Sequence, residues 1–162
     1  MQNPSASGVA LRDVTEDDLP TFFEQQLDPL AIHMAAFTTK DPSDKDAFSK
    51  RWTRILTDDT IAIKTILLDG SVASHVAQFE RFGEPEVTYW IGREYWGKGV
   101  ATEALSEFLR DVKMRPLFAR AAKDNVASIR VLEKCGFTIT AYETAFANAR
   151  DERSFAALLR LC

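Results

Sequence analysis

Apolar residues recur along this chain with two different spacings, and each spacing is typical of one kind of secondary structure. Alternating or β-branched apolar stretches predict strands over residues 9–14, 61–68, 72–79, 86–91, 116–122, 137–142 and 155–161. Apolar stripes with a spacing of three and four predict helices over residues 19–30, 47–56, 100–112 and 125–135. The predicted order is βααβββαβαββ, a mixed α/β sheet.

Local signals support the boundaries of these elements. Thr15 and Asp18 are spaced like a capping box at the start of the first helix. Asp41-Pro42 marks a break before the second helix, because proline disfavours a helical conformation in the residue before it. Asp69-Gly70 between two apolar stretches predicts a β-hairpin.

The length of the chain predicts one domain. At 162 residues, a folded chain buries roughly 70% of the surface that it exposes when unfolded, which requires one sizeable core. We find no internal repeat and no linker-like stretch. We therefore predict a single domain over residues 9–162 after a short flexible N-terminus, residues 1–8.

The charge balance argues against a nucleic-acid or membrane partner. Lys and Arg number 20 against 24 Asp and Glu, a net charge of −4, and the basic residues form no run. Binding to phosphate backbones or to acidic lipid needs clustered basic side chains. No apolar run approaches the ~18 residues that span a bilayer, and residues 1–8 do not resemble a signal peptide.

The few cysteine and histidine residues suggest a cytoplasmic protein without a metal site. Cys135 and Cys162 lie too far apart for a CxxC pair, which is typical of a reduced compartment. His33 and His75 stand in no ligand spacing with cysteine or with each other.

A glycine-rich turn is the first candidate site. Gly97-Lys98-Gly99 lies between the strand that ends at Ile91 and the helix from Val100. Glycines at such a turn let the backbone approach an anion, and the free N–H groups of the helix start point toward it. The turn suits a pyrophosphate, although a plain tight turn has the same pattern. A nucleoside-triphosphate loop needs Ser or Thr after the lysine, where this chain has Gly99.

Two longer motifs carry a resemblance to a known family. The chain reads YWIGREYWGKGVATEA over residues 89–104 and NVASIRVLEKCGF over residues 125–137. Both resemble the GNAT superfamily of N-acetyltransferases, and most of all its RimJ/RimL-type branch. The resemblance implies an α/β (α+β) fold, a single-domain, mixed and mostly antiparallel twisted sheet flanked by helices.

The resemblance implies acetyl-CoA as co-substrate and no metal. In the family the glycine turn binds the pyrophosphate of acetyl-CoA through backbone N–H groups. The residues implied here are Gly97, Lys98, Gly99, Val100, Ala101 and Thr102. Glu94 stands where the family usually has Gln or Arg, so we expect binding with an altered affinity. Lys98 either adds charge near the phosphates or is a solvated turn lysine.

The second motif is expected to lie along the rest of CoA. Asn125 and Ser128 share a helix face, because residues three apart are neighbours on a helix. By resemblance, Asn125 fixes the loop or an amide of CoA, and Ser128 lies near the sulfur. Arg130 and Lys134 either reach the 3′-phosphate or are surface charges without a ligand.

The implied chemistry is direct attack of a neutral amine on the thioester in a ternary complex. Glu86 resembles the family's general base in position, and the alternative is a solvated glutamate at a strand edge. A backbone N–H near Ile91 would polarise the thioester carbonyl. Many family members protonate the thiolate with a tyrosine, whose position holds Leu132 here, so Ser128 or a water is the candidate donor and Tyr142 a weaker one.

We therefore expect an N-acetyltransferase acting on a primary amine, either a small molecule or a protein N-terminus. A GNAT-fold module that senses acyl-CoA without turnover is the alternative. The segments Asp28–Asp46 and Glu143–Arg153 are expected to frame the acceptor, since loops carry specificity. The negative net charge slightly favours a cationic acceptor, and the chain is expected to be a monomer or homodimer.

Overall fold

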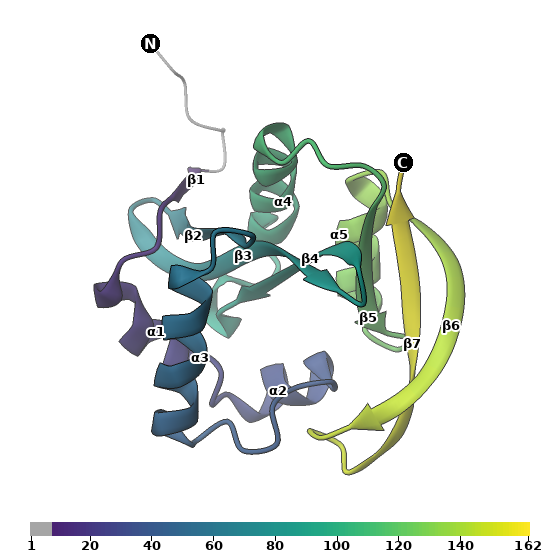
Figure 1. Ribbon diagram of the computed structural model, residues 1–162, viewed down its shortest axis with the longest axis horizontal. Helices are drawn as coiled ribbons and strands as arrows, with labels where there is room; N and C mark the ends of the chain where they lie inside the picture. Colours follow the sequence, from purple (N-terminus) through teal and green to yellow (C-terminus); the bar gives the residue numbers. More distant parts are fainter. Residues whose placement is uncertain (1–7) are drawn as a thin grey trace.

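The computed structural model describes residues 8–162, which form one sheet with helices on both faces (Figure 1). The strands are β1 (Val9–Arg12), β2 (Ala62–Leu68), β3 (Ser71–Arg81), β4 (Glu84–Ile91), β5 (Leu117–Ala122), β6 (Thr138–Ala147) and β7 (Glu152–Leu161). The helices are α1 (Leu19–Gln25), α2 (Pro29–Ala35), α3 (Lys45–Thr57), α4 (Val100–Asp111) and α5 (Val126–Lys134), with 3-10 turns η1 (Glu16–Asp18) and η2 (Arg93–Tyr95). The strand order is β1-β2-β3-β4-β5-β7-β6, so the predicted fold class is confirmed.

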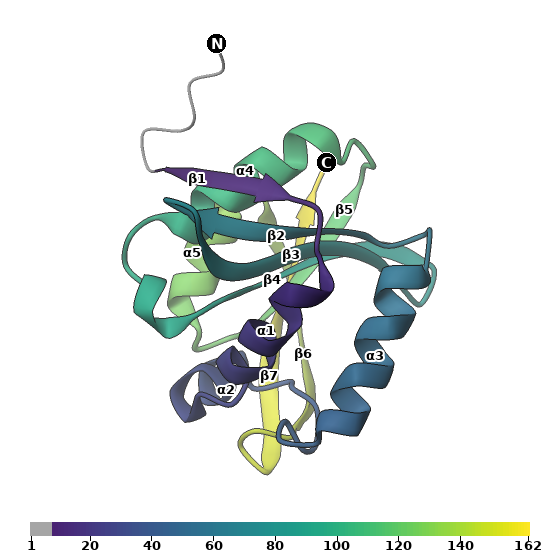
Figure 2. The same ribbon diagram turned by 90° about the vertical axis from the view of Figure 1, so that its left-hand side faces the viewer.

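Two apolar layers hold the helices to the sheet. Helices α4 and α5 cover one face, where Phe108 and Leu132 are each 2% exposed. Helices α1 and α3 cover the other face of the sheet (Figure 2). On this face the rings of Phe22 and Trp52 lie 5.1 Å apart. Each such side chain contributes about 1.5–3 kcal/mol through its burial. The two layers therefore fix which face of each strand meets which helices.

The hairpin of β2 and β3 follows the prediction. Asp69 and Gly70 have φ angles of 50° and 86°, which is the left-handed geometry that tight hairpin turns require. The two strands then pair antiparallel from Leu68↔Ser71 to Ala62↔Gln78.

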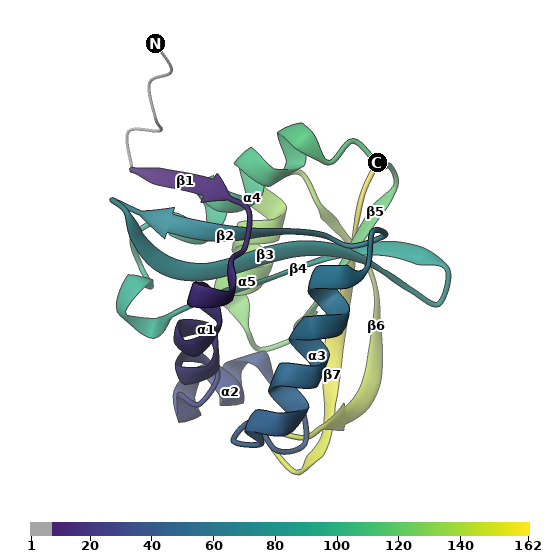
Figure 3. The ribbon, with the colours of Figure 1, turned by 60° about the vertical axis from the view of Figure 1, so that its left-hand side comes forward.

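The sheet separates into two halves between β4 and β5. These strands are parallel and pair only at Glu86↔Phe118. Beyond that point β4 stays paired with β3 up to Ser74↔Ile91, while β5 stays paired with β7 up to Ala122↔Ala156. Figure 3 shows β4 and β5 running in different directions after they meet. The edge of β4 that faces β5 is consequently without a strand partner over its second half.

The first predicted helix is divided in two. The sequence pattern predicted one helix over residues 19–30, whereas α1 ends at Gln25 and α2 begins at Pro29. Asp28 is extended, with φ −64° and ψ 115°, because the ring of Pro29 disfavours a helical conformation in the residue before it. The carboxylate of Asp28 then caps α2 by accepting a hydrogen bond from the N–H of Leu30 at 3.1 Å. Residues 8–162 thus form one α-helix more than the predicted order has.

The last two strands are longer than predicted. The pattern ended one strand at residue 142 and began the next at 155, but the pairing of β6 and β7 continues from Thr138↔Arg160 to Ala147↔Glu152. The predicted connection over 143–153 is wrong for most of its length, because only residues 148–151 connect the two strands.

The start of the chain is described from Gly8 onward. The predicted flexible segment over residues 1–8 lies outside the described residues except for Gly8, whose carbonyl oxygen accepts a hydrogen bond from the N–H of Asp69 at 3.0 Å. Within residues 8–162, no helix combines the length and the apolar character needed to cross a membrane.

Candidate active site

The free edge of β4 presents a backbone donor. The N–H of Gly92 donates to the carbonyl oxygen of Ala73 on β3 at 2.8 Å. Because bonded and non-bonded pairs alternate in an antiparallel ladder, the N–H and C=O of Ile91 point away from β3. The indole N–H of Trp96 donates to this carbonyl oxygen at 2.9 Å. The N–H of Ile91 faces the same side, where β5 has already diverged.

The glycine turn has the conformation that only glycine adopts readily. Gly97 and Gly99 have φ angles of 74° and 76°, and a Cβ atom at either position would meet nothing within 4 Å. The requirement for glycine therefore comes from the backbone angle rather than from crowding. Lys98 between them is exposed and forms no ion pair with any residue of 8–162.

The start of α4 is an open set of N–H donors. Gly99 is the N-cap residue and supplies no side-chain cap, and the first helical hydrogen bond runs from the N–H of Glu103 to the carbonyl oxygen of Gly99. The N–H groups of Val100, Ala101 and Thr102 consequently have no acceptor within the helix. Together with the positive end of the helix dipole they form a suitable place for a phosphate.

Asn125 connects two helices at the start of α5. Its Oδ1 atom accepts a hydrogen bond from the N–H of Ser128 at 3.3 Å, which caps α5. Its Nδ2 atom donates to the carbonyl oxygen of Met34 in α2 at 3.2 Å. Both halves of the amide are thus in use, so the geometry suits the predicted role of fixing the loop better than a direct bond to CoA.

Ser128 contacts Tyr89, a residue for which the two motifs implied no role. Its hydroxyl oxygen lies 2.7 Å from the hydroxyl oxygen of Tyr89 on β4. Burial raises the pKa of Tyr89 to about 12, partly offset by the hydrogen bond to Ser128. Leu132, one helical turn after Ser128, is 2% exposed within the core. The motif spacing gave no signal for this contact, because it depends on how α5 packs against a strand far away in the sequence.

Glu86 is buried among arginine residues. It is 6% exposed, so the alternative of a solvated strand-edge glutamate is wrong. Its two carboxylate oxygens accept hydrogen bonds from the Nε atoms of Arg81 and Arg120, both at 3.1 Å. Arg120 also pairs with Glu143 on β6. Each carboxylate oxygen keeps a second lone pair that could accept a proton or a hydrogen bond from another group.

Glu86 and Tyr89 lie on opposite faces of β4. Val87, Tyr89 and Ile91 belong to the core under α4 and α5. Since successive side chains of a strand point to opposite faces, Glu86 is directed to the face that α1 and α3 cover. The carboxylate of Glu86 and the hydroxyl of Tyr89 therefore lie on opposite sides of β4, the strand whose edge is free.

Helix α2 lies across the opening between the two halves of the sheet. At its start, Asp28 pairs with Arg93, which follows β4, at 2.9 Å. Near its end, the carbonyl oxygens of His33 and Met34 accept hydrogen bonds from the side chains of Arg150 and Asn125. Figure 1 shows α2 below the point where β4 and β5 part. The helix thus links the end of β4 to the start of α5.

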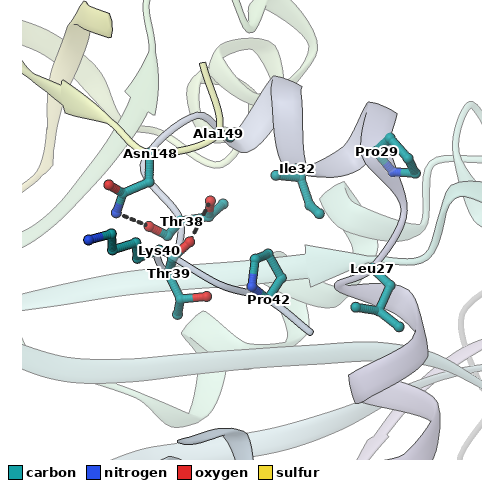
Figure 4. Close-up of a pocket in the computed structure, with 9 residues that line it drawn as sticks. All are labelled: Leu27, Pro29, Ile32, Thr38, Thr39, Lys40, Pro42, Asn148 and Ala149. Carbon is teal, nitrogen blue, oxygen red and sulfur yellow. Dashed lines mark hydrogen bonds between the residues drawn. The ribbon is translucent and has the colours of Figure 1, made fainter. Parts of the chain in front are cut away.

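A pocket of about 290 Å³ lies between α2, residues 38–42 and the turn that joins β6 to β7 (Figure 4). Its lining combines both segments predicted to frame the acceptor, and consists of Leu27, Pro29, Ile32, Thr38, Thr39, Lys40, Pro42, Asn148 and Ala149. The side-chain amide of Asn148 donates to the carbonyl oxygen of Thr38 at 2.8 Å, which holds the two segments together. None of the lining residues is acidic.

The remaining predicted contacts are isolated on the surface. Arg130 and Lys134 are exposed on α5, and neither forms an ion pair with a residue of the described range. Over residues 8–162, no three His, Cys, Asp or Glu side chains come together in a way that could hold a metal ion.

Comparison with known families decides the classification. The profile described as "Acetyltransferase (GNAT) domain" matches residues 9–138. The chain belongs to the GNAT acetyltransferase family. This GNAT protein is accordingly an acetyltransferase enzyme. No curated protein sequence matches it.

Solved structures share the GNAT fold at low sequence identity. The spermidine N-acetyltransferase of Vibrio cholerae, in complex with CoA and spermine, has a TM-score of 0.82 at 16% identity, covering 96% of this chain and 95% of that one. RimJ of Mycobacterium smegmatis, in complex with CoA-disulfide, has a TM-score of 0.75 at 19% identity, covering 94% and 81%. The yncA protein of Salmonella typhimurium, with its cofactor acetyl-CoA, has a TM-score of 0.74 at 19% identity, covering 95% and 93%. At these identities the likeness shows the fold alone.

Proposed function

We propose that this GNAT acetyltransferase transfers the acetyl group of acetyl-CoA to a primary amine by direct attack in a ternary complex. The observation that carries the proposal is the free edge of β4, which ends in a turn of two left-handed glycines and an uncapped helix start. A thioester carbonyl needs a backbone donor, and a pyrophosphate needs several. Both kinds of donor occur along one continuous stretch of chain, residues 91–102.

The proposed place of acetyl-CoA follows from this stretch. The pyrophosphate contacts the N–H groups from Gly97 to Thr102, and the pantetheine arm lies along the edge of β4 toward α5. The N–H of Ile91 then donates to the thioester carbonyl oxygen as negative charge develops on it. Lys98, Arg130 and Lys134 have no ionic partner among the described residues, which leaves them free to meet the phosphates.

The proposed chemistry uses both sides of β4. The amine nitrogen forms a bond to the thioester carbon, and the carbon–sulfur bond then breaks with its electron pair going to sulfur. Glu86, on the face of α1 and α3, accepts the proton that the amine loses, directly or through a water molecule. Ser128, on the side of α5, hydrogen-bonds to the departing sulfur. The acceptor and CoA therefore approach from opposite faces of the sheet.

We propose that the acceptor is framed by residues 28–46 and by the β6–β7 turn, residues 148–151. The pocket on α2 combines residues from both. Its lining has a lysine and no carboxylate, so it offers no complement to a polyamine, although the net charge of −4 favours cations in general. An amine whose remaining groups are apolar or neutral fits this lining better. Membership of the RimJ/RimL-type branch is part of the proposal and rests on the two motifs.

A module that binds acyl-CoA without turnover is the second candidate. The observation that favours it is the position of Glu86, both of whose oxygens already accept a hydrogen bond from an arginine. Leu132 also favours this candidate, because many family members have at this position a tyrosine that protonates the departing thiolate. The two candidates share the CoA site and differ only in the transfer step.

One experiment in two stages separates them. Calorimetric titration of the full chain with acetyl-CoA is run beside dephospho-CoA and ATP–Mg²⁺. The bound protein is then mixed with a panel of amines, and thiol release is followed. Micromolar binding with amine-dependent release supports the enzyme, and binding without release by any amine supports the sensor. Absence of acetyl-CoA binding overturns both.

A further inference from the structure

The hydroxyl groups of Tyr89 and Ser128 share one hydrogen bond. Their oxygens lie 2.7 Å apart, and either one can be the donor. A hydroxyl carries one proton and two lone pairs, so such a pair holds one proton in the shared bond and keeps the other free. Whichever group donates, the pair still presents one O–H to a third group.

The pair lies between the two halves of the sheet. Tyr89 belongs to β4 and lies three residues beyond Glu86, where β4 makes its single pairing with β5. Its side chain is on the same face of the sheet as that of Ile91. Ser128 belongs to the first turn of α5, where its N–H donates a hydrogen bond to Oδ1 of Asn125. The shared bond thus runs from the free edge of β4 to the helix that follows β5. Beyond Glu86 no backbone pairing joins these strands, so the pair is a specific side-chain link across the opening.

No donor stands one turn further along α5. The resemblance places a proton-donating tyrosine of many family members at position 132, where this chain has a buried leucine. An apolar side chain can neither donate to a thiolate nor hydrogen-bond to Ser128. A hydroxyl that reaches the same helix from β4 supplies the missing donor from a different element.

We propose that Tyr89 and Ser128 act as one unit that donates a hydrogen bond to the sulfur of departing CoA, with Tyr89 positioning the Ser128 hydroxyl. The proposal rests on the proposed acetyl transfer. When the carbon–sulfur bond breaks, its electron pair goes to sulfur, and the free O–H of the pair stabilises the resulting thiolate. The proton lost by the amine leaves through Glu86, and CoA takes up its proton from solvent. No proton is lost from the pair itself.

The environment keeps both protons on the pair. Burial raises the pKa of Tyr89 to about 12, so the phenol is neutral near pH 7. A neutral phenol can donate to Ser128 or accept from it, whereas a phenolate could only accept.

The test is a double-mutant cycle of Tyr89→Phe, Ser128→Ala and the combined variant. Ser106→Ala is the matched control, because it also removes a part-buried hydroxyl. Ser106 lies on α4, and its hydroxyl oxygen is 3.6 Å from the sulfur of Cys135, the residue that follows α5. For each variant, kcat and KM come from thiol release, and acetyl-CoA affinity comes from calorimetry. Ser128→Thr keeps a hydroxyl at the same position and serves as the conservative variant.

We expect each single loss of a hydroxyl to lower kcat by about 10- to 100-fold, somewhat below full acid–base catalysis. Acetyl-CoA affinity should stay within about threefold, and the combined variant should be no slower than the slower single one, because groups that act as a unit are not additive. Ser128→Thr keeps a hydroxyl and should therefore restore much of the kcat that Ser128→Ala loses. Ser106→Ala should retain the kcat of the unsubstituted protein.

Three results would overturn the proposal: an unchanged kcat in Tyr89→Phe, multiplicative losses in the double variant, or a loss confined to acetyl-CoA affinity. If Tyr89→Phe does not fold, Ser128→Ala against Ser128→Thr still decides whether a hydroxyl is needed. Absence of turnover in the unsubstituted protein with every amine would instead refute the proposed function itself.

Discussion

The carboxylate of Glu86 on β4 accepts a hydrogen bond at 3.1 Å from the guanidinium of Arg120 on β5, beside the single pair that joins these strands. A candidate proton acceptor is therefore also part of the contact between the two halves of the sheet. Substitution of Glu86 should affect both the rate and the stability, and the two effects can be measured apart.

We expect Glu86→Gln to lower kcat by about 100-fold, because an amide cannot take the proton of the amine. Acetyl-CoA affinity should be unchanged, since Glu86 lies on the face away from α5. The midpoint of thermal unfolding should fall, because one arginine loses its acceptor. Glu84→Gln is the control on the same strand, since Glu84 is exposed and forms no ion pair with the described residues. Unchanged turnover in Glu86→Gln would remove Glu86 from the proposed chemistry.

Gly99→Ala tests the phosphate site. A left-handed φ of 76° should cost an alanine about 1–2 kcal/mol of stability, and strain relief would turn the N–H groups away from the phosphate. Gly83→Ala is the matched control, because Gly83 has a φ of 80° and equally open space, but lies in the β3–β4 turn. Both variants should lose similar stability in urea titrations, while only Gly99→Ala should weaken acetyl-CoA binding in calorimetry. Equal affinities would argue that residues 97–99 are a plain turn.

Asn125→Asp separates the effects of the two hydrogen bonds that the side chain of Asn125 makes, one with the N–H of Ser128 and one with the carbonyl oxygen of Met34. A carboxylate still caps α5, and its charge suits the positive helix end, but it cannot donate to the carbonyl oxygen of Met34. We expect the KM for the amine to rise several-fold through the loosened α2, with little change in the KM for acetyl-CoA. Asn125→Ala loses both bonds and should in addition cost about 1 kcal/mol of stability. A rise in the KM for acetyl-CoA alone would instead favour direct contact between Asn125 and CoA.

The stability of the protein should depend on pH through His75. Burial lowers the pKa of His75 from 6.5 to about 3, and the charge of Arg51 adds to this. Between those values the unfolded state binds a proton that the folded state does not, so stability is complete above pH 6.5 and declines as the pH falls toward 3. The ring packs against Phe22 and Trp52 at 4.8 and 5.0 Å, so His75→Phe should preserve the packing and flatten this part of the pH profile. His33→Gln, at an exposed position, should leave the slope intact in urea titrations from pH 4 to 7.

The regular elements were predictable where local chemistry decides them. Asp69-Gly70 specifies a hairpin by backbone angle alone, and Gly97 and Gly99 specify the turn before α4 in the same way. Asn125 was expected to fix the loop or an amide of CoA, and the capping hydrogen bond that the structure shows needs only its own helix. Such features involve residues within a few positions of one another, so the sequence contains the whole cause.

The errors have two physical origins. The split between α1 and α2 had a local signal, Asp28-Pro29, which the helical stripe over 19–30 outweighed. The partners of Glu86 and of Ser128 had none, because Arg120 and Tyr89 reach them through strand pairing and helix packing over 34 and 39 positions of chain. A pattern of spacings cannot show which distant side chains meet.

The way in which α2 is held bears on how the proposed acceptor pocket can change. Near its C-terminal end, Asn125 and Arg150 both donate to main-chain oxygens of α2, not to its side chains. Substitutions of side chains that line the pocket, such as Ile32, leave these main-chain acceptors in place. A pocket with a different lining, and so a different proposed acceptor, can therefore evolve or be engineered one residue at a time while the hydrogen bonds that hold α2 stay in place.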